Sequence, residues 1–81
     1  MMEMDRVFST NIFSNTVRVL RCRKTHRYFT GGGWSSDPAE ARVYARDIDI
    51  AQECVSRNLH EVELVLRTAP SGAELFCTPV R

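Results

Sequence analysis

The segment EVELVLRT at residues 61–68 constrains the fold more than any other part of the chain. In an extended conformation Val62, Leu64 and Leu66 point to one side, and this alternation with period two is typical of a strand that covers a core. The other side carries Glu61, Glu63, Val65 and Arg67. The pattern predicts a strand of an antiparallel sheet with one face buried.

A second alternating segment, TVRVLRCRK at residues 16–24, predicts another strand. Val17 and Val19 fall on one of its faces, and Leu20 and Cys22 fall on the other. The aromatic segment RYFT at 27–30 predicts a short third segment of sheet. With KTH between the two as the turn, residues 16–30 are expected to form a hairpin.

Three consecutive glycines end this regular pattern, and two signals for the start of a helix follow. Asp37 precedes Pro38, with Glu40 three positions after the aspartate, and Asp47 precedes a longer apolar pattern. We therefore expect a turn, a short strand at 42–45 and a helix at 48–58. A single helix over residues 38–58 stays open as the alternative.

The expected helix carries an apolar stripe at helical spacing. After a turn at 69–72, the segment at 73–80 is expected to form an edge strand that ends near Pro79. The fold class is α+β, a small mostly antiparallel sheet of four to five strands with one helix packed on one face, in the order β-β-β-α-β-β. Residues 16–81 form this single domain, and residues 1–15 form a loosely ordered N-terminal segment. The predicted core is Trp34, Tyr44, Ile48, Val55, Leu64 and Leu66.

Composition limits the class of protein. Hydrophobic residues make up 43% of the chain and charged residues 26%, as in an ordinary globular domain. No apolar run approaches the ~20 residues that cross a bilayer. Glu3 and Asp5 stand where a signal peptide would be basic, so we expect a cytoplasmic protein without membrane partners.

Charge is divided unevenly although the net charge is only +1. Residues 6–36 hold six basic side chains and no acid, whereas residues from 37 onward hold eight acids and five arginines. Basic and aromatic side chains close together are the usual means of gripping a phosphate backbone and stacking on bases. The candidate binding residues are Arg18, Arg21, Arg23, Lys24, Arg27, Tyr28 and Trp34. The competing interpretation is that these arginines only keep a strand soluble and block aggregation of the sheet.

No catalytic, metal or cofactor site is predicted. Cys22 with His26 lacks a third group to orient a base, and Cys54 and His60 fall on either side of a helix end. The three cysteines and two histidines lack the close spacing of metal ligands, so we expect three buried, free thiols. The glycine run lacks the lysine of a phosphate-binding loop and leads to Asp37, which disfavours an anion.

The layout GGGWSSDPAEARVY, then a helix, then HEVELVLR resembles small uncharacterised bacterial and phage α+β modules. The likeness covers about residues 16–67 and lies in structural positions: the tryptophan, the Asp-Pro pair, an Ala-x-x-aromatic pattern and Val-Glu-Leu-Val. It implies a fold, and it assigns no role to any residue.

The function expected from these observations is a small non-catalytic protein-interaction or regulatory module with a protein partner. The alternative is a nucleic-acid-binding module that uses the basic aromatic hairpin at residues 18–34. Because Pro79 blunts the edge formed by the last strand, we expect the arginine-bearing hairpin to be the open edge, available for a homodimer or for a partner strand.

Overall fold

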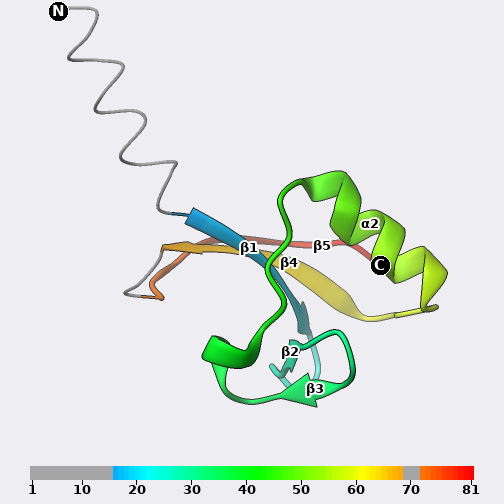
Figure 1. Cartoon of the computed structure of the whole chain (residues 1–81), viewed down its shortest axis with the longest axis horizontal. Helices are drawn as coiled ribbons and strands as arrows, with labels where there is room; N and C mark the ends of the chain where they lie inside the picture. Colours follow the sequence, from blue (N-terminus) through cyan, green and yellow to red (C-terminus); the bar gives the residue numbers. More distant parts are fainter. Residues whose placement is uncertain (1–15, 69–71) are drawn as a thin grey trace, which may run out of the picture.

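The computed structural model describes residues 16–68 and 72–81. It confirms a small α+β domain in which one helix packs on a five-stranded antiparallel sheet of order β3-β2-β1-β4-β5 (Figure 1). The predicted N-terminal segment 1–15 and most of the turn at 69–72 lie outside the described residues. The elements, in chain order, are β1 (Thr16–Cys22), β2 (Tyr28–Phe29), β3 (Trp34–Ser35), a 3₁₀ turn η1 (Pro38–Glu40), α2 (Asp47–Ser56), β4 (Val62–Thr68) and β5 (Glu74–Pro79).

The two strands with the clearest alternation, β1 and β4, pair along their whole length at the centre of the sheet. Thr16 lies opposite Thr68 and Cys22 opposite Val62, which places Leu20 opposite Leu64. This register puts the even-numbered apolar residues of both strands on the face that carries α2. A slip of one residue would move them all to the other face, so burial fixes the register.

The hairpin between β1 and β2 closes through two backbone hydrogen bonds, from Cys22 N to Arg27 O (2.8 Å) and from His26 N to Cys22 O (2.9 Å). The glycine run then lets the chain reverse, since Gly31 adopts a φ of 100° that residues with a Cβ rarely take. The reversal creates β3, which pairs with β2. The third strand in chain order is therefore Trp34–Ser35. The strand predicted at 42–45 is reduced to a single bridge between Tyr44 and Arg18.

Residues 37–56 settle the choice between one helix and two starts. Asp37 caps η1 by accepting a hydrogen bond from Ala39 N (3.0 Å), as predicted. The chain is then extended through Tyr44, and α2 begins at Asp47 with Arg46 as the N-cap. The Asp49 carboxylate accepts from Arg46 N (3.2 Å), which satisfies a backbone donor at the start of the helix. A single helix over 38–58 is excluded.

The end of α2 follows from Asn58, which adopts a left-handed conformation with φ 55°. Asn58 N donates to Val55 O (3.2 Å) and Leu59 N donates to Cys54 O (2.9 Å), the hydrogen-bond pattern of a Schellman motif. The helix predicted at 48–58 therefore ends at Ser56. The motif sends the chain back directly into β4.

The core lies between α2 and the sheet, but it uses a different side of the helix from the one predicted. Ile50 and Cys54 are fully buried, whereas Ile48 and Val55 are exposed. Both sets have helical spacing, so periodicity alone could not choose between them. Tyr44 and Leu64 are buried as predicted, Leu66 packs against the core from its margin, and Trp34 is exposed. The core cluster consists of Leu20, Phe29, Tyr44, Ile50, Cys54, Val62 and Leu64.

The edges of the sheet also differ from the prediction. The arginine-bearing hairpin strand β1 is the central strand, so it offers no open edge. The edge on the hairpin side is β3, which has only two residues. The other edge is β5, which has six residues and ends at Pro79. The long edge of the sheet is therefore formed by the strand that Pro79 was expected to protect.

Candidate functional site

The predicted basic surface is not a single surface in the structure. Arg18 lies on the face of the sheet that carries α2, and its Nε donates to Asp47 Oδ1 (2.6 Å). Arg21 is three positions further along the same strand and therefore points to the opposite face, where Tyr28 also lies. Lys24 sits in the turn and pairs with Glu61 (3.2 Å). Three of the five basic candidates are thus neutralised by acids from the second half of the chain.

Arg21 is the centre of a charged network on the open face of the sheet. Its guanidinium contacts Glu63 (Nε to Oε2, 2.7 Å) on β4 and Glu74 (Nη1 to Oε1, 3.0 Å) on β5. The side chains of Arg21 and Glu63 are each only 11% exposed. Burial lowers the pKa of Arg21, but the hydrogen bonds that its guanidinium donates to Glu74 and Glu63 outweigh this effect and raise the pKa above its usual value. Arg21 is therefore committed to an internal ion pair.

The ring of Tyr28 contacts Arg67 of β4 as well as Arg21. The guanidinium carbon of Arg67 lies 5.7 Å from the centre of the Tyr28 ring, and that of Arg21 lies 6.0 Å from it. Both contacts are within the range of cation–π attraction. The ring of Tyr28 thus contacts two arginines of its own domain.

The turn at residues 23–27 is the exposed remainder of the predicted basic surface. Arg23 and Arg27 are exposed, and among the described residues no ion pair involves either of them. A shallow hollow of about 270 Å³ lies beside Arg27 and is lined by Cys22, Thr25 and Trp34 as well. Two isolated arginines and one indole make a much smaller positive surface than the sequence suggested.

Trp34 borders this hollow and packs edge-to-face on Phe29, with 5.2 Å between the ring centres. The thiol of Cys22 accepts a hydrogen bond from Thr25 N (3.5 Å). Hydrogen bonding to the Thr25 side chain, and to a smaller extent to the backbone of Thr25 and Lys24, lowers the pKa of Cys22. No base lies beside the thiol in any contact of the described residues. The indole is therefore the main feature that a ligand would meet in this hollow.

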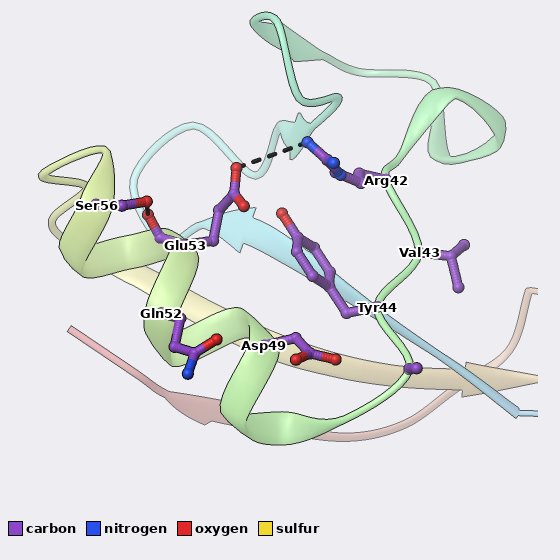
Figure 2. A pocket seen from close by; sticks show the side chains of 8 residues that line it. Arg42, Val43, Tyr44, Asp49, Gln52, Glu53 and Ser56 are labelled. Carbon is purple, nitrogen blue, oxygen red and sulfur yellow. Dashed lines mark hydrogen bonds and ion pairs between the residues drawn. The ribbon is translucent and has the colours of Figure 1, made fainter.

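A larger hollow of about 460 Å³ lies between α2 and the extended segment at residues 42–45 (Figure 2). Figure 2 shows the Tyr44 hydroxyl pointing toward the gap between Arg42 and Glu53, which are joined at 3.7 Å. Tyr44 is only 7% exposed, and its hydroxyl has no hydrogen-bond partner in the described part of the chain. Burial, together with Glu53, raises the pKa of Tyr44 to about 12, so the phenol stays protonated at neutral pH.

The charged groups around this hollow are largely satisfied by one another. Glu53 also pairs with Arg57, one turn later on α2. Asp49 receives hydrogen bonds from the backbone and the guanidinium of Arg46. The acids and arginines here alternate and cancel, so the hollow offers no strong field to a charged ligand.

The opposite flank of α2 exposes apolar side chains. Ile48 is 51% exposed and Val55 69% exposed, with Ala51 between them, and the three residues line a hollow of about 340 Å³. The flank of α2 that carries Asp49 and Glu53 faces residues 42–45, which lie beside β1 through the bridge between Tyr44 and Arg18. The flank that carries Ile48 and Val55 is therefore directed to the β4–β5 side.

On that same side, β5 exposes two large apolar residues, Leu75 (52%) and Phe76 (54%). Phe76 lies opposite Leu66, whose side chain borders the core, so Phe76 points to the face that carries α2. The end of β5 reaches the helix, because Arg81 Nη1 donates to Cys54 O (2.9 Å), and Figure 1 shows the C-terminus beside α2. We call Ile48, Ala51, Val55 and Phe76 the α2–β5 surface.

Sequence reasoning missed this surface because it assigned Ile48 and Val55 to the core. One signal was present: Leu75 and Phe76 are adjacent, so both cannot face the core of a regular strand. The structure adds a bulge between Leu66 and Arg67, where the β4–β5 register shifts and Leu75 becomes the extra residue.

The cysteines and acids form no reactive constellation in the described residues. Cys54 is buried and Cys22 is half-buried, but Cys77 is exposed on β5, so the prediction that all three thiols are buried is wrong for Cys77. All three are free. Within residues 16–68 and 72–81, no group of three His, Cys, Asp or Glu side chains is arranged to hold a metal ion.

Comparison of the chain with protein-family models, with curated proteins and with solved structures finds no match. The likeness to small bacterial and phage modules therefore stays a prediction. In the part of the chain that the structure describes, no helix has the length and apolar character needed to cross a membrane.

Proposed function

We propose that this domain is a non-catalytic protein-interaction module that binds a protein partner through the α2–β5 surface. The single observation that carries the proposal is the exposure of Ile48 and Val55, which line one hollow on α2, together with that of Phe76 on β5, each at least half exposed. Contiguous apolar surface is costly in water and marks interaction sites in soluble proteins.

Charge supports a protein partner over a nucleic acid. Affinity for a phosphate backbone comes mainly from basic side chains that displace counterions. Arg18, Arg21 and Lys24 are already paired with acids, which leaves Arg23 and Arg27 as the exposed cations of the turn. Two cations would give weak binding to nucleic acid, with an affinity that falls only slightly as the salt concentration rises.

The test compares proteins captured from cells that express the chain by the wild type and by two substituted variants. Val55→Glu places a charge on the α2–β5 surface. Val43→Glu is the matched control, because Val43 is also a strongly exposed valine (59%) but lies by the opposite flank of α2. We expect a partner that binds the wild type and Val43→Glu and that is lost with Val55→Glu.

Two results would contradict the proposal. The first is an identical set of captured proteins for all three forms, with no self-association. The second is retention on DNA that falls steeply with salt, by a slope of about −0.7 to −0.9 per phosphate contact, and that disappears in Arg23→Glu/Arg27→Glu. Arg21 is left unchanged because a glutamate there would face Glu63 and Glu74.

A further inference from the structure

The outer side of β5 has a definite hydrogen-bonding pattern. Val80 N donates to Val62 O (3.0 Å), so the pair Val62–Val80 belongs to the inner ladder. Because inward and outward positions alternate along an antiparallel strand, Thr78 bonds inward with Leu64. The backbone groups of Cys77 and Pro79 therefore point outward, away from β4. Proline has no N–H, so its position there costs the inner ladder nothing.

We propose that β5 pairs with β5 of a second copy of this chain, antiparallel and with Cys77 opposite Cys77 across a two-fold axis. This inference rests on the proposed function and names the partner at the β5 part of the same surface. In this register each Cys77 donates its N–H to the other Cys77 carbonyl. Pro79, which lacks a donor, falls opposite the bulged residue Leu75, so the two irregular positions of the strand coincide.

Side chains on both faces agree with this register. On the face that carries α2, the two copies of Phe76 lie diagonally across the axis, within the reach of aromatic side chains. Each buries part of the ring surface that the single chain leaves in water. On the other face the two exposed thiols of Cys77 meet.

Charge does not oppose the pairing of two copies. In this register Glu74 of one chain falls opposite Val80 of the other. Glu74 is already paired with Arg21 of its own chain, and Arg81 already donates to Cys54 O of α2. Glu74 is the only acid on β5, and Arg81 is the only basic residue after it. No like charges oppose each other across the new pair of strands. Many edge strands carry charged side chains that prevent such pairing, and β5 lacks this protection at the proposed contact.

A two-stranded contact is small compared with the ~1,000 Å² or more of a durable interface. We therefore expect a dimer that dissociates on dilution, measurable by sedimentation over a wide range of concentration. The α2–β5 surface remains partly free in such a dimer, since Ile48 and Val55 lie on the helix above the sheet.

The experiment uses two substitutions at one position. Cys77→Pro removes the outward N–H without touching the inner ladder, and it should leave the chain monomeric at concentrations where the wild type dimerises. Cys77→Ser keeps the N–H and should still dimerise. Circular dichroism and a thermal melt confirm that each variant is folded.

Oxidation tests the register with the unaltered protein. Cα atoms of a hydrogen-bonded antiparallel pair are about 5.5 Å apart, which is within the range that a disulfide spans. A mild oxidant should convert the wild-type dimer into a reducible, covalently linked pair joined at Cys77. A Phe76→Asp variant, which disrupts the contact across the axis, should lose at least ten-fold in its rate of cross-linking.

A wild type that is monomeric at millimolar concentration overturns the inference, as does a dimer that Cys77→Pro leaves intact. Either result leaves the proposed function standing if another protein is still captured and is lost with Val55→Glu. A chain that neither dimerises nor captures a partner contradicts both proposals.

Discussion

On the face of the sheet that carries α2, Leu20 and Leu64 are covered by apolar side chains such as Ile50. On the opposite face, Val19 and Val65 are buried to the same degree, with 1% of each exposed, although no helix of residues 16–68 and 72–81 lies above them. The two faces reach the same burial by different chemistry.

The register explains the second face. Val19 and Val65 lie opposite each other in the middle row of the open face. Arg21 reaches from the row on one side to Glu74, and Arg67 reaches from the row on the other side to Tyr28. Both arginine side chains therefore cross above the two valines. Arginine stems can cover apolar surface while their charged ends pair with partners. The two arginine side chains therefore shield the valines from water, as a second helix would in a larger domain.

The largest effect is expected from breaking the apolar face. Leu64→Ala removes a buried side chain from the centre of the core and should lower the free energy of unfolding by about 2–5 kcal/mol. Leu75→Ala is the matched control, since Leu75 is half exposed on the neighbouring strand, and it should change stability by less than about 0.5 kcal/mol. Chemical denaturation measures both. Equal losses would mean that the strand faces are assigned wrongly.

A smaller effect is expected from breaking the charged face. Arg21→Met keeps an unbranched side chain over the valines but leaves the buried Glu63 carboxylate without its partner. Because an unsatisfied buried group costs about 1–3 kcal/mol, we expect a loss of that size. The double variant Arg21→Met/Glu63→Leu should recover most of it, because neither charge then remains. A double variant no more stable than the single one would show that the loss comes from the missing arginine and not from an unpaired Glu63 carboxylate.

The smallest effect concerns pH. The hydrogen bond from Arg21 holds the pKa of Glu74 below its usual value of 4.5. A carboxyl whose pKa is lower in the folded state stabilises the fold above its unfolded pKa, and that contribution is lost as pH falls toward the folded pKa. Stability should therefore decline on acidification below about pH 5, and Glu74→Gln should flatten the decline. The measurement is the free energy of unfolding of both forms from pH 7 to pH 3. Parallel curves would contradict the assignment.

Local patterns were sufficient for much of the fold. Alternation in residues 16–24 and 61–68 predicted the two central strands, and Asp37 marked the turn before α2. Each of these features depends on side chains acting on their own backbone or on the period of a strand. Such effects are written in a few neighbouring residues, so a single sequence reveals them.

The candidate site was predicted less well, because it depends on which segments meet. Arg21 reads as part of an exposed basic run, yet its partners Glu63 and Glu74 are more than forty residues away along the chain. Nothing local distinguishes it from Arg23, which stays exposed in the turn. A basic residue of this run is an exposed cation only where no acid from a distant strand pairs with it.

The sequence by itself determined the class of the domain and its central strand pair, because these follow from periodicity. Only the tertiary structure decided which side of α2 is buried. Ile50 with Cys54 and Ile48 with Val55 are both apolar sets at helical spacing, and the bridge between Tyr44 and Arg18 sets how the helix meets the sheet. The set that was left outside, together with the edge at β5, is the surface on which the proposed function depends.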